Sequence, residues 1–437
     1  QVQANALLEV YHSARQTDPA YQGALAAADA TSENEKQARG ALLPQVNITA
    51  SGTYRDVSVD SFDFQTQTIR TAEDNYTETA YQLSITQSIL RFDQFANLAI
   101  GKLQSKQAEL DRYLAEQELV ARAAEAYFAF LAAKTDLVTA QAEREAISSQ
   151  LEQAQKRYEV GLIAVTDVQE AQASYDLADA QLILAEQEME NAKDIMREIA
   201  GQHIDELPDL KAQIPMSAPA GSNQDWVDRA MQNNPQLARA KLQTAIANKQ
   251  MGALKAGHLP SLQAEAGYGR QDNLDSPTFG SDRKGASIGL QLNIPLFSGG
   301  TTSSRARQAS YQKVQAEQQT EQTRRTVERE TRAAYRAMSS SIRRVQALGQ
   351  AVESNKTALE ATQAGYDVGT RTSVDVLAAR SGLFRAQRDF AKSRYDYALS
   401  LIRLYRAEGS LSPEHLVVLN GWLENSLSDY SDVGEQP

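Results

Sequence analysis

The sequence predicts an α+β membrane protein built from two copies of one unit, in which pairs of strands are followed by very long helices. Three observations predict this fold class. Distant motifs recur in register, four short segments alternate between apolar and small polar residues, and two helical patterns each continue for about 65 residues. The repeat matters most, because a duplication determines how the whole chain is organised.

Two proline motifs reveal the duplication. Asp18-Pro19 and Leu43-Pro44 recur 216 residues later as Asn234-Pro235 and Leu259-Pro260. Around each first motif, residues 4–41 and 225–257 carry apolar positions at helical spacing. Each copy therefore begins with a helical segment.

A turn-like motif reveals the same duplication further along. RYEVGLIAVTDV at residues 157–168 recurs 208 residues later as GYDVGTRTSVDV, and a heptad of large apolar residues follows each copy. The two heptad series are Val168, Tyr175, Leu182, Met189 and Met196, and Val376, Leu383, Phe390, Tyr397 and Leu404. We assign a first repeat to residues 1–200 and a second to 225–409. Residues 201–224 and 410–437, which contain helix-breaking Gly and Pro, are expected to be irregular or short-helical.

Four segments alternate with the period of two that places successive side chains on opposite faces of a strand. Their apolar members are Val46, Ile48, Ala50, Tyr54, Leu83, Ile85 and Ile89 in the first repeat, and Leu262, Ala264, Ala266, Tyr268, Ile288, Leu290, Leu292, Ile294 and Leu296 in the second. The intervening residues are mostly small and polar. The strands are expected within about 45–90 and 261–297, with polar loops over 56–75 and 270–285.

A long helical pattern follows each strand pair, over residues 93–158 and 300–366. At about 1.5 Å per residue, each helix would be on the order of 100 Å long, which exceeds a globular domain. The turn motif then reverses the chain, and a helix of about 35 residues returns in a coiled-coil rhythm. The result is one long helical hairpin in each repeat.

The composition excludes several classes of function. The chain has 44 basic and 56 acidic residues, a formal net charge of −12, and no cysteine. Nucleic-acid binding needs a concentrated positive surface, and disulfides or thiolate metal sites need cysteine. The longest apolar run, residues 126–133, is too short for a transmembrane helix.

No pattern points to an enzyme, a metal site or a bound cofactor. Only His203 among the four histidines has nearby acids, in His203-Ile204-Asp205-Glu206, and this cluster lacks a second set of ligands. Glycine-rich phosphate loops and nucleophile elbows are also missing from the sequence.

The strands are the feature that points to a membrane. An antiparallel sheet could cover a compact helical core, but these helices are too long to form one, and the polar sheet face carries small residues rather than Lys and Glu. Strands of about ten residues cross a bilayer at a tilt, and four strands are too few to close a barrel. We therefore expect several chains to share one barrel. A soluble coiled-coil scaffold is the alternative, and it leaves the strands unexplained.

Several motifs resemble the TolC family of outer-membrane efflux and secretion ducts of Gram-negative bacteria. They are Leu43-Pro44-Gln45 before a strand, Gln87-Ser88-Ile89-Leu90, Ile294-Pro295-Leu296-Phe297-Ser298-Gly299-Gly300, and the doubled Val-Gly…Asp-Val turn. The resemblance covers nearly the whole chain. It implies a homotrimer with a twelve-stranded barrel in outer-membrane lipid, a periplasmic α-helical barrel, and an equatorial belt formed by residues 201–224 and 410–437.

The same resemblance implies a function and partners. The duct would be the outer-membrane exit of tripartite efflux pumps and type I secretion systems, passing drugs, small molecules or proteins. A periplasmic adaptor (membrane fusion) protein would connect it to an inner-membrane transporter of the RND, ABC or MFS class. Neither the partners nor the trimer follows from composition or periodicity.

The resemblance also implies a gate beside the two turn motifs. Carried over by position, its residues are Tyr158, Thr166 and Asp167 in the first copy, and Tyr366, Arg371 and Asp375 in the second. Arg and Tyr can donate directed hydrogen bonds to Asp or Thr across a helix interface. The turn residues Gly161, Leu162, Gly369 and Thr370 are candidates for contact with the adaptor.

A structural role for the same acids remains an alternative. Thr166 to Gln169 fits a helix-capping box around Asp167, whereas Thr372 or Ser373 would cap the helix near Asp375. The position one helical turn after Asp375 is Ala378, where related gates carry a second acid, so a trimer of this chain would have a single acidic ring. Gly161 and Gly369 are expected to adopt a positive φ at the reversal.

Overall fold

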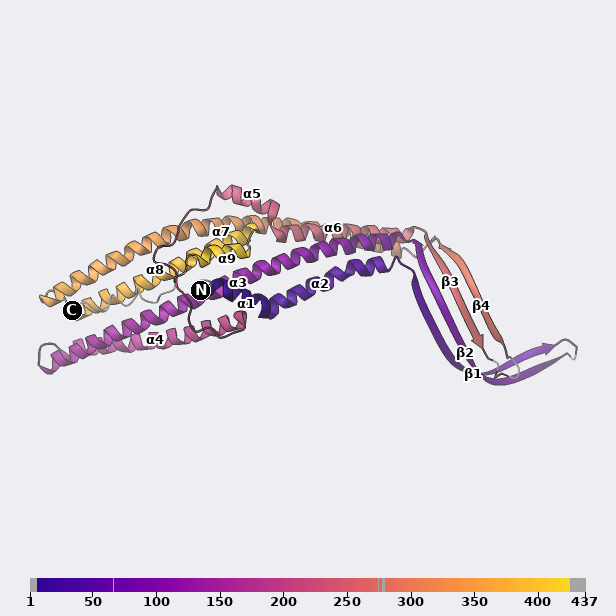
Figure 1. Ribbon diagram of the computed structural model, residues 1–437, viewed down its shortest axis with the longest axis horizontal. Helices are drawn as coiled ribbons and strands as arrows, with labels where there is room; N and C mark the ends of the chain where they lie inside the picture. Colours follow the sequence, from indigo (N-terminus) through magenta and orange to yellow (C-terminus); the bar gives the residue numbers. More distant parts are fainter. Residues whose placement is uncertain (1–5, 66, 274, 277–279, 425–437) are drawn as a thin grey trace. The chain divides into compact units, whose positions relative to one another are not determined.

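The computed structural model describes residues 6–65, 67–273, 275–276 and 280–424. Each repeat has the same order of elements, namely two shorter helices where one helical segment was predicted, two strands, a long helix and a returning helix (Figure 1). The first repeat comprises α1 (Ala6–Thr17), α2 (Pro19–Gly40), β1 (Gln45–Asp63), β2 (Thr68–Leu90), α3 (Phe92–Glu159) and α4 (Val165–Ala200). The second comprises α5 (Asn223–Asn233), α6 (Pro235–Lys255), the short η2 (Ala256–His258), β3 (Ser261–Asp272), β4 (Asp282–Asn293), α7 (Thr301–Asp367) and α8 (Ser373–Glu408), and α9 (Pro413–Asn420) follows.

The prolines divide each predicted N-terminal helical segment into two helices. Proline lacks an N–H and is tolerated in the first turn of a helix, so a new helix begins at it. The residue before each proline caps that helix: Asp18 Oδ1 accepts the Tyr21 N–H at 2.6 Å, and Asn234 Oδ1 accepts the Leu237 N–H at 3.2 Å. The two copies thus use the same break.

The long helical hairpins agree with the predicted periods. α3 and α7 contain 68 and 67 residues, and the returning helices α4 and α8 contain 36 each. Several of the predicted heptad positions are buried, among them Met196 and Leu404. In the described part of the chain, no helix has both the length and the apolar character needed to cross a membrane.

The four strands form one antiparallel sheet in the order β1-β2-β3-β4. Cross-strand partners extend the predicted alternation across the whole sheet. One row consists of Val46, Ile85, Ala266 and Ile288, and the neighbouring row on the opposite face consists of Asn47, Ser84, Gly267 and Ser287. The sheet therefore has one apolar and one polar face, as predicted.

Large apolar side chains of this sheet are exposed. Ile288 is 89% exposed and Leu290 is 70% exposed, and every described residue of β4 is exposed. Apolar surface exposed on this scale marks a contact with another protein or with a membrane. Within the described residues, β1 and β4 each pair with a neighbouring strand on one side only, so the sheet has two open edges.

The strands extend beyond their predicted limits at one end and stop short at the other. Most of the loop predicted over 56–75 is wrong, because β1 and β2 stay paired up to Asp63 and Thr68, and the loop predicted over 270–285 shrinks to the residues between Asp272 and Asp282. In this part of β1 the alternation changes face, because Asp56 and Asp60 lie on the face that carries Val46 and Ile48, while the backbone ladder continues. β4 ends at Asn293 and excludes Ile294 and Leu296, since Pro295 has no N–H to donate to the ladder.

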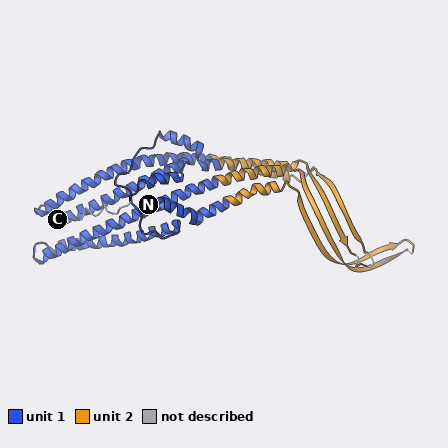
Figure 2. Cartoon of the chain, viewed as in Figure 1, with its two compact units in different colours: residues 1–27, 110–239, 321–437 blue, residues 28–109, 240–320 orange. Residues whose placement is uncertain are grey.

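The chain divides into two compact units that cut across the repeats (Figure 2). Residues 28–109 and 240–320 form the unit that contains the sheet, and residues 1–27, 110–239 and 321–437 form the other. The latter, unit 1 in Figure 2, holds the main hydrophobic core, whose largest fully buried side chains include Tyr11, Tyr127, Phe128, Tyr397 and Leu404.

The two segments expected to be irregular contact each other. Leu210 and Leu423 form an isolated antiparallel bridge, the Lys211 N–H donates to the Trp422 carbonyl at 2.8 Å, and the Glu424 N–H donates to the Asp209 carbonyl at 2.7 Å. The short helix α9 lies within the second segment. Residues 425–437 of the predicted C-terminal segment lie outside the described residues.

Candidate gate at the helix tips

Each helical hairpin reverses through the same hydrogen-bonded turn. At the end of α3, the Gly161 N–H donates to the Tyr158 carbonyl and the Leu162 N–H to the Arg157 carbonyl, both at 2.9 Å. At the end of α7, the Gly369 N–H donates to the Tyr366 carbonyl at 3.0 Å and the Thr370 N–H to the Gly365 carbonyl at 2.8 Å. This pattern is the Schellman motif, which ends a helix with a left-handed residue.

The predicted positive φ of both turn glycines is confirmed: φ is 78° at Gly161 and at Gly369. A Cβ atom at either position would meet no heavy atom within 4 Å, so glycine is needed for its backbone conformation rather than for space. Leu162 and Val368 are strongly exposed beside them, at 73% and 75%. The tips therefore present an apolar side chain on a fixed turn.

Tyr366 contacts a residue that sequence reasoning did not assign. The Arg157 guanidinium donates a hydrogen bond to the Tyr366 hydroxyl and lies over the Tyr366 ring, 4.9 Å from its centroid. This contact joins the last turn of α3 to the last turn of α7. A basic residue near a helix C-terminus is ordinarily explained by the helix dipole, which is why Arg157 carried no specific signal.

Arg371 packs against the end of α7, the long helix of its own hairpin. A Cβ atom at Gly365 would lie 2.8 Å from Arg371 Cγ, so only glycine leaves room for this side chain. Within the described residues of this one chain, no hydrogen bond or ion pair occupies the Arg371 guanidinium. It therefore remains available for a partner.

Asp375 is part of a helix cap. Its N–H donates to the Thr372 hydroxyl at 3.2 Å, and its carboxylate accepts the Thr372 N–H at 2.9 Å and the Thr372 hydroxyl at 3.0 Å. These hydrogen bonds, backbone first, hold the pKa of the Asp375 carboxyl below its ordinary value, and Arg371 contributes in the same direction. Thr372 is thus the cap, as expected, and Asp375 is its reciprocal partner.

The first copy does not repeat this cap, so the capping box expected at Thr166 is wrong. α4 begins at Val165 with Ala164 as the N-cap and without a side-chain hydrogen bond, which places Thr166 and Asp167 inside the first turn. Within the described residues of this one chain, neither Asp167 nor Tyr158 forms a side-chain hydrogen bond with Tyr366 or Arg371. Among the six candidates, the described contacts of this one chain therefore link Tyr366 to the first hairpin through Arg157.

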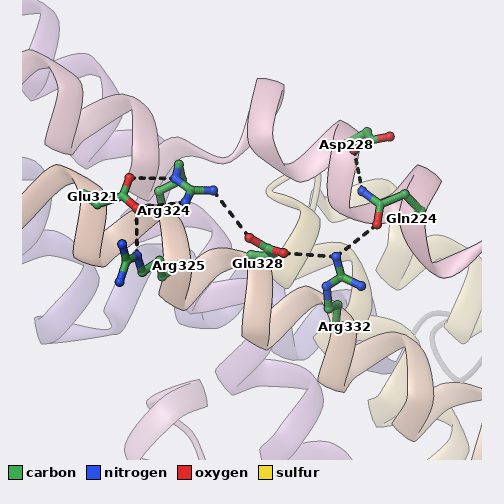
Figure 3. Close-up of polar contacts among 7 residues, drawn as sticks. All are labelled: Gln224, Asp228, Glu321, Arg324, Arg325, Glu328 and Arg332. Carbon is green, nitrogen blue, oxygen red and sulfur yellow. Dashed lines mark hydrogen bonds and ion pairs between the residues drawn. The ribbon is translucent and has the colours of Figure 1, made fainter.

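A separate polar cluster joins α5 to α7 (Figure 3). Glu321 accepts hydrogen bonds from Arg324 and Arg325, which lower the pKa of its carboxyl to about 2. Arg332 connects Glu328 to Gln224 of α5, at 3.0 Å on both sides. The cluster is solvent-exposed, so we assign it to helix positioning rather than to chemistry.

Both ring nitrogens of His203 have a polar neighbour. One ring nitrogen of His203 lies 2.8 Å from Arg197, and the other lies 2.8 Å from Asp205. Among the described residues, no group of three or more His, Asp or Glu side chains could hold a metal ion.

An exposed apolar sheet face with a polar reverse side, together with long helical hairpins that reverse through fixed turns, defines a subunit of a membrane channel. Residues 10–202 and 226–410 match the outer membrane efflux protein family, and the chain belongs to this family. It is an outer-membrane exit duct of the efflux and secretion type. The two matched ranges coincide closely with the two repeats.

Curated relatives agree along nearly the whole chain. The chain is 36% identical to outer membrane protein TolC of Vibrio cholerae over 97% of its own length and 95% of the relative. It is 32% identical to outer membrane protein TolC of Escherichia coli, with 98% and 86% covered. It is 29% identical to the alkaline protease secretion protein AprF of Pseudomonas aeruginosa, with 94% and 85% covered. These relatives are channel proteins rather than enzymes, and they leave the soluble scaffold without support.

Solved structures show the same fold. The Campylobacter jejuni CmeC outer membrane channel superposes with a TM-score of 0.79 at 18% identity, covering 96% of this chain and 87% of that one. VceC of Vibrio cholerae superposes with a TM-score of 0.77 at 21% identity, covering 92% and 96%. The α+β fold with a long helical extension is thus confirmed.

Proposed function

We propose that three copies of the chain form one outer-membrane duct, each lending four strands to a twelve-stranded barrel. The observation that carries this proposal is the sheet with two open edges and an exposed apolar face. No strand edge can stay unpaired in lipid, and four strands cannot close a barrel. β4 of one copy would therefore pair with β1 of the next, and the polar face would line the passage.

The duct would take its cargo from a periplasmic adaptor and an inner-membrane transporter of the RND, ABC or MFS class. Relatives named for outer-membrane efflux and for protease secretion support both small molecules and proteins as cargo. The tips that carry Gly161, Leu162, Gly369 and Thr370 are exposed and structurally fixed, which suits them to contact the adaptor. The transporter, rather than the duct, would select the cargo.

The tips would also close the resting duct. The proposed gate comprises Tyr158, Thr166, Asp167, Tyr366, Arg371 and Asp375. Arg371 has a guanidinium without a partner among the described residues of its own chain, and Asp167 and Thr166 of a neighbouring copy offer oxygen acceptors for it. Asp375 would place one ring of negative charge at the constriction, which favours a low, cation-selective conductance.

Detergent extraction and electrophoresis test the duct. We expect the purified protein to need detergent, to migrate as a heat-sensitive oligomer with three times the mass of the chain, and to conduct ions in a planar bilayer. A monomer that stays soluble without detergent would refute the proposal.

A double substitution tests the gate separately. Asp167→Ala combined with Arg371→Ser is expected to raise the conductance, because it removes both halves of the inter-copy contact. Glu186→Ala with Arg385→Ser removes the same charge types from exposed positions of α4 and α8 outside the turns, and it should leave the conductance unchanged. Equal conductance in all three proteins would contradict the gate assignment.

A further inference from the structure

We propose that Arg157 is a positioning residue of the gate: it holds Tyr366, and with it the second helical hairpin, against the first hairpin of the same protomer. The inference rests on the proposed closure of the duct at the helix tips. Arg157 is not one of the six gate candidates, and the contact that it makes joins the two hairpins of a single protomer.

Two kinds of contact act on the same ring. The Arg157 guanidinium donates to the Tyr366 hydroxyl and also lies 4.9 Å from the ring centroid. The hydrogen bond depends on the hydroxyl group, whereas the cation–π contact depends on the aromatic face. Substitutions that remove one or both can therefore separate their effects.

The backbones of both residues are fixed by the turns beside them. The Arg157 carbonyl accepts the Leu162 N–H, and the Tyr366 carbonyl accepts the Gly369 N–H. Both residues thus belong to the last turns that the Schellman motifs hold in place. A contact between them restrains the relative position of the two tips, and not merely two flexible side chains.

Along one face of α3, three residues make polar contacts with the second hairpin, and Arg157 is the one nearest the tip. Further from the tip, Asp136 forms an ion pair with Lys392 at 2.5 Å, and Glu143 accepts the Ser381 hydroxyl at 2.6 Å. Residues 136, 143 and 157 differ by multiples of seven, so they share one face of α3. These three polar contacts join the first hairpin to the second, and the contact at Arg157 lies nearest to the tip.

The duplication makes this contact asymmetric. The position equivalent to Arg157 in the second copy is Gly365, and the position equivalent to Tyr366 is Tyr158. A glycine cannot repeat the contact with Tyr158, and Arg371 lies over that glycine instead. The Arg157–Tyr366 contact therefore occurs once in each protomer, and the seam between protomers relies on other residues.

Single-channel recording in planar bilayers tests the role of Arg157. We expect Arg157→Gln and Tyr366→Leu to raise the resting conductance several-fold, and Tyr366→Phe, which keeps the ring, to raise it less. Arg157→Lys should restore part of the closure, because an ammonium group can still lie over the ring. Both residues act through one contact. The double variant Arg157→Gln with Tyr366→Leu should therefore have a resting conductance no higher than that of either single variant.

Lys156→Gln is the matched control. It removes one positive charge from the adjacent residue, which is paired with Glu152 on its own helix. The heat-sensitive trimer must form in equal yield in every variant, so that the comparison excludes misfolded protein. If Arg157→Gln conducts no more than Lys156→Gln while the Asp167 and Arg371 double variant conducts more, the inference fails and the gate stands. If none of them conducts more, both fail.

Covalent locking gives an independent test, because a cross-link can take the place of the contact that the substitutions remove. The chain has no cysteine, so Arg157→Cys with Tyr366→Cys creates the only two thiols. Joined by a short reducible bis-maleimide, this variant should stay at low conductance, and reduction of the linker should raise the conductance. A joined variant that conducts as freely as the reduced one would overturn the inference.

Discussion

A Cβ atom at Gly409 would lie 2.6 Å from the Cα atom of Asn234, because the turn that ends α8 rests on the break before α6. Gly409 also has a φ of 96°, a backbone angle that residues with a side chain rarely adopt. We expect Gly409→Ala to lower the free energy of unfolding by more than the roughly 1–3 kcal/mol of a left-handed backbone alone, since the neighbouring backbone cannot yield. The change in the free energy of unfolding is measured by urea denaturation, with tryptophan fluorescence as the signal.

Gly23→Ala is the control for that measurement. Gly23 lies within α2, where an added Cβ atom would meet no heavy atom within 4 Å, so alanine should preserve or increase stability there by up to about 1 kcal/mol. Equal losses in the two variants would contradict the close packing of Gly409.

The ion pair at the first helix break predicts a second loss of stability. Asp18 is almost fully buried and its carboxylate pairs with Arg122 at 2.5 Å, whereas the equivalent residue of the second copy is Asn234. Asp18→Asn keeps a capping oxygen for α2 but leaves Arg122 without its charged partner, and we expect a cost of about 1–3 kcal/mol. Thermal unfolding of the detergent-solubilised protein measures it. An unchanged midpoint would show that the pair adds nothing beyond the cap.

Adjacent residues of β4 should respond oppositely to the same substitution. Ile288 belongs to the apolar row of the sheet and Ser287 to the polar row. Lysine at a lipid-facing site costs about 2–4 kcal/mol near the middle of a bilayer, whereas a lumen-facing site tolerates it. We expect Ile288→Lys to reduce the yield of heat-sensitive oligomer strongly and Ser287→Lys to preserve it. The opposite order would reverse the assignment of the two faces.

The cap at Asp375 predicts a pH dependence. Its folded pKa is depressed by hydrogen bonds from Thr372, so its contribution to stability is present above the ordinary Asp pKa near 3.9 and is lost as the pH falls through the lower folded value. The difference in thermal midpoint between the wild type and Asp375→Asn should therefore be constant from neutral pH to about pH 5 and then shrink in acid. A difference that persists unchanged at pH 2 would contradict the cap.

A substitution at Ala378 can supply the second acid that the family resemblance implies for the proposed gate. Ala378 is exposed one helical turn after Asp375. Ala378→Asp should strengthen the block of the duct by polyvalent cations such as hexaamminecobalt, because carboxylates placed close together at a constriction deepen its negative potential. Ala379→Asp, which points about 100° away around the helix, is the control. Blocking constants that match in the two variants would exclude Ala378 from the constriction.

Much of the fold was predictable because its signals are local. The alternation around Ile288 sets a strand with two unlike faces, and the glycines at 161 and 369 mark where the helices reverse. The far part of β1 and β2 escaped prediction, since polar residues such as Asp56 and Asp60 occupy the positions where apolar ones would reveal the period. Hydrophobic alternation reports burial and not backbone pairing.

The candidate gate was predictable only in part. The sequence placed Tyr366, Arg371 and Asp375 beside one turn, but it did not identify their contacts. The Thr372 N–H donates a hydrogen bond to the Asp375 carboxylate, and the Arg157 guanidinium donates one to the Tyr366 hydroxyl. Caps and ring contacts depend on where a helix begins and which helix lies beside it, and motif spacing carries neither.

By itself, the sequence determined the duplication, because its motifs recur at a fixed offset, and it determined the strand faces and the long helical hairpins, because each follows from a period that neighbouring residues repeat. Only the tertiary structure decided that Arg157 reaches Tyr366 across 209 positions of the chain, and that the irregular segments pair at Leu210 and Leu423. Such contacts form between residues that are remote in the chain, and their partners are chosen by helix packing, which no local pattern encodes.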